Sequence, residues 1–266
     1  MRRALAFAAA RPVLVCAVVA FTARLAYLLT ARGPAFTDPL IDADYYDFLG
    51  ERLARGEGFP DGPFWQPPLY PIVLGALYRT FGHSLWAPRV LQLVLGALTS
   101  GLAASLARRL TGSSPASLLA GLLVALNGSL LFYDGELLPT SLATFLSALA
   151  VWALLANRPL AAGACIGLGA LAVAPVLFLL PVALLFANGV RPRLALLAVC
   201  AGIVLPATAY NFARSGEPIL ISANGGVNLW IGNNPDADAT IAVRPGAGWE
   251  ALVDEPVRLG IDRPGA

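Results

Sequence analysis

The acidic side chains of this chain are concentrated in one segment, which reads DPLIDADYYDFLGERLARGEGFPDGPFWQPPLYP over residues 38–71. The next acidic residues along the chain are Asp134 and Glu136, followed only by Glu217 and a few later ones. A carboxylate within hydrogen-bond distance of a hydroxyl can accept its proton, so this segment has the groups for acid–base chemistry. Carboxylates are costly inside a bilayer, which predicts a site at a membrane surface that water or a partner can reach. The segment contains Asp38, Asp42, Asp44, Asp47, Glu51, Glu57 and Asp61.

The composition explains why a membrane surface is the relevant setting. Of the 266 residues, 58% are hydrophobic and 13% are charged, and the mean hydropathy is +0.70. A soluble domain cannot hide so much apolar surface, so we predict an all-α, multi-span membrane protein. The net charge is only +2, every basic residue is arginine, and we expect no nucleic-acid partner. The cysteines lie in apolar runs and are expected to be buried thiols: Cys16, Cys165 and Cys200.

Apolar runs separated by prolines, glycines and charges place the elements around the acidic segment. The runs cover residues 12–30, 88–107, 115–133, 139–156, 160–187 and 194–212. The first run is long enough to span and no A-x-A cleavage pattern follows it, so we interpret it as an uncleaved span. Pro175 divides the fifth run, which we predict to be a hairpin of two short spans in preference to one long helix.

Arginine clusters set the orientation of the spans. They occur at residues 2–11, 108–109, 158 and 191–193, and the positive-inside rule places all of them in the cytoplasm. That placement requires the hairpin, which gives seven spans with a cytoplasmic N-terminus. We therefore expect a transmembrane core at residues 1–214, with its first outer loop at 31–87. An outer-side polar tail follows at 215–266, and we expect the chain to be a truncated product.

The acidic segment is predicted to form two helices at the membrane surface. Asp42 is a favoured residue type for an N-cap, and Tyr45, Leu49 and Leu53 then share one apolar face. This helix should lie along the membrane with that face downward, and a glycine-rich stretch ends it. The second helix follows the PPLYP motif at residues 67–71. It is too short and interrupted to span, so we expect an interfacial or re-entrant helix.

The order of these motifs resembles that of polytopic glycosyltransferases with the GT-C fold. A first span is followed by DADYY, GEG, PPLYP, a cytoplasmic RRLTG and then LFYDGELL at residues 131–138. The chain is similar to the bacterial relatives of protein O-mannosyltransferases and of lipid A aminoarabinose transferases (glycosyltransferase family 39). The resemblance covers nearly the whole chain, including GGVNLWIGNNP at residues 225–235. It implies a GT-C-like bundle in the inner membrane of a bacterium, with the active site facing outward.

The resemblance also implies a reaction. A sugar passes with inversion from a polyprenyl-phosphate carrier to a glycan, lipid or protein acceptor on the outer side. Asp42 matches the family's aspartate early in the first outer loop, which acts as base on the acceptor hydroxyl or orients the acceptor. A divalent metal is a candidate cofactor, with Asp42 and Asp44 as candidate ligands. The candidate substrate-binding residues are Arg24, Asp44, Tyr46, Gln66, Tyr70, Arg89, Asp134 and Glu136.

Two positions depart from the family pattern. Trp65 and Gln66 stand where the aminoarabinose transferases have an acidic residue and a lysine before the double proline. The sequence LAVAP at residues 171–175 stands where a basic residue often occurs between the fifth and sixth spans. Arg24 and Arg89 are the candidate replacements for the missing phosphate-binding cations.

Each candidate also has a purely structural interpretation. Asp42 could be only a helix cap, Arg24 could extend to the interface, and Asp134 with Glu136 could form an ordinary polar turn. His83, the only histidine, is expected to be a loop residue rather than a ligand. Two other functional classes stay open. One is a lipid or solute transporter, which needs charges at midspan, and the other is a non-catalytic module that assembles envelope proteins.

Overall fold

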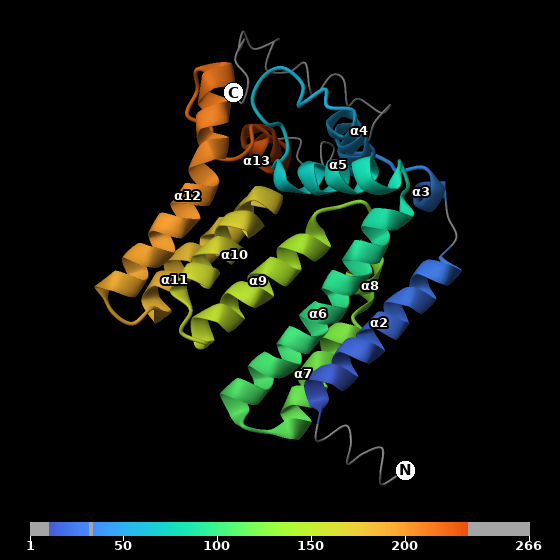
Figure 1. Ribbon diagram of the computed structural model, residues 1–266, viewed down its shortest axis with the longest axis vertical. Helices are drawn as coiled ribbons and strands as arrows, with labels where there is room; N and C mark the ends of the chain where they lie inside the picture. Colours follow the sequence, from blue (N-terminus) through green and yellow to red (C-terminus); the bar gives the residue numbers. More distant parts are fainter. Residues whose placement is uncertain (1–10, 32–33, 234–266) are drawn as a thin grey trace.

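The computed structural model describes residues 11–31 and 34–233, and every element in this part of the chain is helical (Figure 1). The protein is an all-helical, multi-pass membrane protein in which a layer of short helices covers one end of the apolar helices. In order, the elements are α2 (Pro12–Thr30), α3 (Pro34–Thr37), α4 (Asp42–Ala54), α5 (Leu69–Phe81), α6 (Trp86–Thr111), α7 (Ser114–Ala125), α8 (Gly128–Gly135), α9 (Thr140–Leu155), α10 (Pro159–Ala172), the 3-10 helix η1 (Ala174–Phe178), α11 (Leu179–Phe186), α12 (Val190–Ser215) and α13 (Gly225–Asn233).

The membrane spans are fewer than the sequence predicts. Among the described helices, α2, α6 and α12 are long and apolar enough to cross a membrane. The pair α7 and α8, bent by 47°, is a fourth candidate if it is counted as one span. The prediction of seven spans is wrong because α9, α10 and α11 contain only 16, 14 and 8 residues. Even α9 extends only about 24 Å at the α-helical rise, less than the roughly 30 Å of a hydrocarbon core.

The chain breaks where Pro175 predicted a break. Helix α10 ends at Ala172, Pro175 lies in η1, and α11 then follows. Residues 160–187 are therefore not one continuous helix, although neither half is long enough to span. Proline cannot donate the backbone hydrogen bond that an α-helix needs, which explains the 3-10 turn at this position.

Helices α10 and α12 run in the same direction, and two glycines of α10 lie against the backbone of α12. A Cβ on Gly163 would lie 2.4 Å from the Leu196 carbonyl oxygen, and one on Gly167 would lie 3.2 Å from the Cys200 oxygen. Small residues let membrane helices approach this closely. Cys200 and the other two cysteines are buried free thiols, as predicted.

Arginines gather at one end of the bundle, which we call the arginine end (Arg11, Arg108, Arg109 and Arg158). Arg11 and Arg108 line one pocket. The guanidinium groups of Arg109 and Arg158 lie 5.8 and 5.6 Å from the centre of the Trp152 ring. Members of three of the four arginine clusters that were predicted to be cytoplasmic thus lie together, and Arg2 and Arg3 lie outside the described residues.

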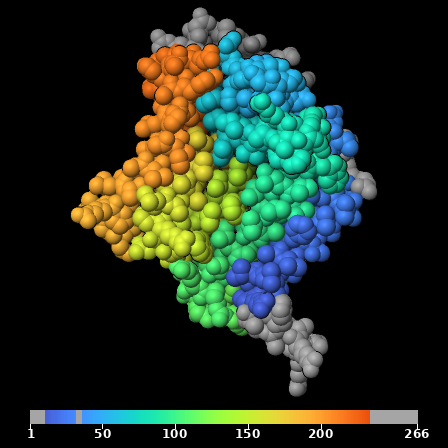
Figure 2. All heavy atoms as spheres, in the orientation of Figure 1, coloured from blue at the N-terminus to red at the C-terminus, as the bar shows by residue number. Residues whose placement is uncertain are grey.

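The acidic loop lies at the opposite end, which we call the loop end (residues 34–81, 136–139 and 216–233). Figures 1 and 2 show the segment between α4 and α5 beside the last turns of α12 at the top of the molecule. The Phe64 backbone amide donates to the Asn211 side chain of α12 at 2.8 Å, which joins the loop to that helix. The loop, the turn after α8 and residues 215–233 therefore share one end, which is the common placement predicted for them. Residues 234–266 of the predicted tail lie outside the described residues.

Helices α4 and α5 are the two surface helices that the sequence predicts, with two corrections. Asp42 is the first residue of α4, and the N-cap is Ile41, which has a φ of 58° and no side-chain hydrogen bond. The prediction that Asp42 is the cap is therefore wrong. Tyr46 and Leu49 are buried, whereas Tyr45 is only half-buried, because α5 packs against the Tyr46 face. The helix is thus rotated from the predicted orientation.

Candidate functional site

A buried ion pair joins α2 to α8. The Arg24 Nε donates to Asp134 Oδ2 at 2.5 Å, and both side chains are almost inaccessible to solvent. Ser141 at the start of α9 donates to the other carboxylate oxygen, Oδ1. The Arg24 Nη1 donates to the backbone oxygens of Ala20 and Ala125, at 3.3 and 3.1 Å. Good partners on both sides are the condition under which a buried charge pair is tolerated.

Two local features of the chain make room for this pair. The helix breaks between α7 and α8, where the Asn127 side chain caps α8. The break leaves the Ala125 carbonyl at a helix C-terminus, where a cation such as Arg24 is favoured. On α6, Gly96 lets the pair lie against the helix, since a Cβ there would be 2.2 Å from Arg24 Nε and 2.3 Å from Asp134 Oδ2. Gly96 was not among the predicted site residues, because glycine in a long membrane helix carries no distinguishing pattern.

Arg89 fastens the start of α6 to α3 and to the end of α8. Its Nε donates to the Gly135 oxygen at 2.9 Å and its Nη2 to the Phe36 oxygen at 2.6 Å. The guanidinium carbon lies 3.7 Å from the centre of the Phe36 ring.

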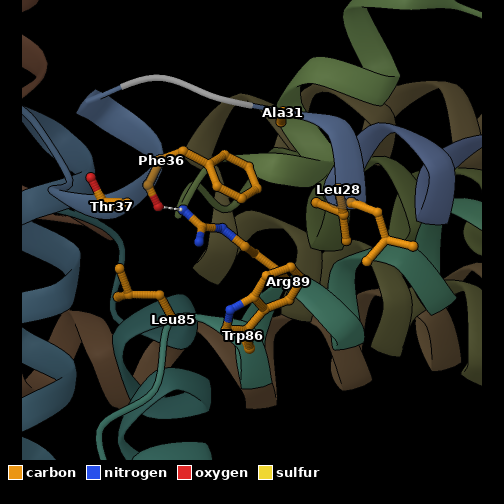
Figure 3. Close-up of a pocket in the computed structure, with 8 residues that line it drawn as sticks. Leu28, Ala31, Phe36, Thr37, Leu85, Trp86 and Arg89 are labelled. Atoms are coloured by element: carbon orange, nitrogen blue, oxygen red, sulfur yellow. Dashed lines mark hydrogen bonds between the residues drawn. The ribbon is translucent and has the colours of Figure 1, made fainter.

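A pocket of about 590 Å³ opens beside Arg89 at the ends of α2 and α6 (Figure 3). Its walls are mainly apolar and aromatic, and the Arg89 guanidinium is its cation. The other lining residues are Leu28, Leu29, Ala31, Phe36, Thr37, Leu85 and Trp86. A pocket of this kind suits an amphiphile with one anionic group.

Gln92, further along α6, connects the ion pair to the loop helices. Its Nε2 donates to the backbone oxygens of Asp134 and Glu136, at 3.0 and 2.6 Å. Its Oε1 accepts from the Tyr70 hydroxyl on α5. Tyr70 packs edge-on against Tyr46, with ring centroids 5.3 Å apart. Gln92 was not among the predicted site residues, because only its burial inside the bundle reveals its role.

Asp42 lies at the solvent-exposed start of α4, next to Gln66. The Gln66 Nε2 is 3.5 Å from Asp42 Oδ1, which is a long hydrogen bond. The Gln66 Oε1 accepts from the Tyr46 hydroxyl at 3.3 Å and from Asn224 Nδ2 at 2.9 Å. Asp42 keeps contact with solvent, yet partial desolvation by the surrounding helices raises its pKa. Burial, and secondarily the Asp42 charge, raises the pKa of the Tyr46 phenol.

Glu136 lies in the turn between α8 and α9. Burial raises its pKa, and the nearby Arg89 guanidinium opposes that shift. Glu136 and Asp42 are joined only indirectly, through a chain of contacts. That chain runs through Gln66, Tyr46, Tyr70 and Gln92.

The described part of α4 does not bring Asp42 and Asp44 together as a pair of ligands. Asp42 and Asp44 are two residues apart on a helix, so their side chains point in different directions. Across the described part of the chain, no three His, Cys, Asp or Glu side chains form a group that could hold a metal ion.

A second polar cluster ties α4 to the connection between α5 and α6. The His83 Nε2 lies 3.0 Å from Asp47 Oδ2, and its Nδ1 lies 3.5 Å from Glu51 Oε1. The Tyr78 hydroxyl donates to Asp47 Oδ1 at 2.5 Å. His83 is thus a loop residue that fastens two elements, as the sequence predicted.

The fold and the site together define a class, a multi-pass helical membrane protein with a polar site at one end. No family model matches the chain, and neither a curated protein nor a solved structure is significantly similar to it. A more specific function is therefore a proposal from the sequence motifs and the geometry of the site.

Proposed function

We propose that this protein is a membrane glycosyltransferase of the GT-C type, related to glycosyltransferase family 39. It moves a sugar from a polyprenyl-phosphate carrier to a glycan, lipid or protein acceptor. In this proposal the loop end faces the outer side of a bacterial inner membrane, and the arginine end faces the cytoplasm.

The observation that carries the proposal is the environment of Asp42. The carboxylate is not used as a helix cap, and its hydrogen bond to Gln66 is long, at 3.5 Å. Solvent still reaches the side chain, while partial desolvation raises its pKa. A general base needs accessible lone pairs and a pKa moved toward the working pH, and Asp42 meets both requirements.

The pocket beside Arg89 supports a lipid-phosphate donor. Its apolar walls at the ends of α2 and α6 suit an isoprenoid chain, and Arg89 supplies the cation for a phosphate. Both arginines are buried, but the Arg24 guanidinium is paired with the Asp134 carboxylate and does not line this pocket, whereas the Arg89 guanidinium does. Of the two arginines predicted as phosphate ligands, the geometry therefore favours Arg89.

In the proposed step, Asp42 accepts the proton of the acceptor hydroxyl as the hydroxyl oxygen bonds to the anomeric carbon. The bond between that carbon and the phosphate oxygen breaks, and its electron pair leaves with the phosphate. Attack on the side opposite the phosphate inverts the carbon. A cation near the leaving phosphate, such as Arg89, stabilises the charge that develops there.

The test compares two isosteric variants of α4 in membranes that carry the full chain. Asp42→Asn should lower transfer from a polyprenyl-phosphate sugar by about 100- to 10,000-fold, the usual loss when a general base is removed. Asp44→Asn, the matched control, removes the same charge from an exposed neighbour and should retain most of the activity. Wild-type rates in the Asp42→Asn variant would rule out the base. Lost transfer with intact assembly of partner complexes would distinguish an enzyme from an assembly module.

One observation favours a second candidate, a lipid or solute transporter. The buried pair of Arg24 and Asp134 lies at the break between α7 and α8, and transporters place substrate and ion sites at broken helices. Its bonds to Ser141 and to backbone oxygens favour a fixed structural role instead. Flux of a labelled lipid in vesicles that Asp134→Asn abolishes and Asp42→Asn preserves would select the transporter.

A further inference from the structure

We propose that Asn224, in the segment that follows α12, is a positioning residue for Asp42. It touches Asp42 only through Gln66, whose Oε1 accepts from Asn224 Nδ2 at 2.9 Å and whose Nε2 approaches Asp42 Oδ1 at 3.5 Å. The segment after the last span would therefore complete a site whose reactive carboxylate lies in the first loop. The two amides that join these segments, Gln66 and Asn224, are 158 residues apart in the sequence.

The orientation of the Gln66 amide decides what Asp42 meets, because the donor and the acceptor of an amide point in different directions. Asn224 and the Tyr46 hydroxyl both donate to the Gln66 oxygen, which leaves its NH₂ group directed at Asp42. In the opposite orientation, the Gln66 oxygen would face an ionised carboxylate, which is unfavourable. Asn224 is itself oriented by Ser222, whose hydroxyl donates to Asn224 Oδ1 at 3.0 Å.

The segment that carries Asn224 is held in place by a fully buried asparagine. Asn211, near the end of α12, accepts from the Phe64 amide at 2.8 Å. Its Nδ2 donates to the backbone oxygens of Ile219 and Ile221, at 3.2 and 3.0 Å. The Ala223 amide then donates to the Phe64 oxygen at 2.8 Å. One side chain thus fixes both the loop and the following segment, so the position of Asn224 is set by the fold.

A donor directed at Asp42 favours its ionised form, which is the form a base needs. The role of Asn224 in sugar transfer rests on the function proposed above. Its effect on Asp42 does not, and can be measured without a substrate.

The experiment replaces Asn224 by Asp, which has nearly the same size but cannot donate. The carboxylate introduced at position 224 can only accept a hydrogen bond, so the Gln66 amide turns its NH₂ group toward it. The Gln66 oxygen then faces Asp42. We expect the Asp42 carboxyl to keep its proton to a higher pH than in the wild type. The probe is a carbodiimide, which modifies protonated carboxyls, applied to the full chain in membranes over a range of pH. Mass spectrometry of the peptide that contains Asp42 gives the midpoint.

Direct repulsion between two carboxylates would move the midpoint in the same direction, and a Gln66→Leu background separates the two causes. If Gln66 transmits the effect, Asn224→Asp leaves the midpoint unchanged in that background. An equal shift in both backgrounds, or no shift in either, would overturn the role of Asn224. Asn228→Asp, which adds the same charge at an exposed position of α13, should leave the midpoint unchanged.

If the Asn224→Asp variant does not reach the membrane, Asn224→Ala can replace it in the same comparison with and without Gln66→Leu. This substitution adds no charge. It should raise the midpoint by less, because the Tyr46 donor to Gln66 remains. No change in this variant would also overturn the proposal. A wild type that binds no sugar donor and transfers nothing would count against the proposed function alone.

Discussion

The two halves of the membrane bundle are held together by different interactions. In the N-terminal bundle (α2, α6, α7 and α8), polar side chains are buried between helices, and glycines make room for side chains. Gly96 admits the Arg24–Asp134 pair, and Gly121 admits Cys16. In the C-terminal bundle (α9 to α12), a continuous apolar cluster fills the interior, and Gly163 lets backbone approach backbone. The buried polar residues of the N-terminal bundle are Arg24, Arg89, Gln92, Thr99, Ser100, Ser117 and Asp134.

This difference shows how the helices that carry the site are held at fixed positions along one another. An apolar side chain gains little by moving from lipid to a helix interface, because the lipid tails are equally apolar. Apolar packing therefore has little preference for one relative position of two helices. Hydrogen bonds and ion pairs are directional, and they fix how far one helix is shifted along another. Gln92 and Arg89 lie on α6, and Leu28 and Leu29 of the Arg89 pocket lie on α2, so the polar half carries much of the site. The buried polar side chains of the apolar half are Ser141 at the start of α9, which donates to Asp134, and Asn211 near the end of α12, which accepts from Phe64.

The largest effect is expected from breaking the ion pair in the polar half. Asp134→Ala leaves the buried Arg24 guanidinium without its carboxylate, which should cost about 3–5 kcal/mol of the free energy of unfolding. Denaturant titration of the purified protein in lipid–detergent micelles measures this loss. Replacing both residues, as Arg24→Leu with Asp134→Leu, removes the unpaired charge and should recover most of it. A double variant as unstable as the single one would mean that the pair itself holds the bundle.

An intermediate effect is expected in the apolar half. A Cβ on Gly163 would lie 2.4 Å from the backbone oxygen of Leu196, and backbone cannot rotate away as a side chain can. Gly163→Ala should therefore force α10 and α12 apart and cost about 1–3 kcal/mol. The matched control is Gly202→Ala in α12, where nothing lies within 4 Å of the added methyl group. It should be neutral or stabilise the helix by about 0.5–1 kcal/mol. Equal loss in both variants would contradict the close helix contact.

The sequence predicted the features that depend on local composition. The helical class follows from hydropathy, the break in the hairpin follows from Pro175, and α4 and α5 follow from the pattern of the loop. The number of spans was wrong, because apolar character does not set helix length. Helices α9 and α10 are as apolar as a span, yet they end at 16 and 14 residues.

The candidate site was predictable only in part. Asp134 and Arg24 were selected as rare charges in apolar surroundings, but nothing in their spacing indicates that they pair. Gln92 and Asn224 carry no sequence signal, since a single amide in a long chain has many uses. Their roles depend on which distant backbone groups the fold brings within hydrogen-bond distance, and that information lies in the tertiary contacts.

The smallest expected effect on the free energy of unfolding comes from removing one serine hydroxyl in each half. Ser100 in α6 donates across the helix interface to the backbone oxygens of Cys16 and Gly121, at 3.2 and 2.9 Å. Ser147 in α9 donates only to the Ala143 oxygen of its own helix, at 2.7 Å. Ser100→Ala should cost about 0.5–1.5 kcal/mol, because it removes a contact between helices.

Ser147→Ala should change the free energy of unfolding little, because the carbonyl it releases remains in its helical hydrogen bond and alanine favours the helix. Both variants remove the same hydroxyl from a membrane helix, so any general effect of serine cancels in the comparison. The same denaturant titration measures both. Equal changes would show that buried hydroxyls add nothing between helices, and the directional contacts of the polar half would then be those of the Arg24–Asp134 pair, Arg89 and Gln92.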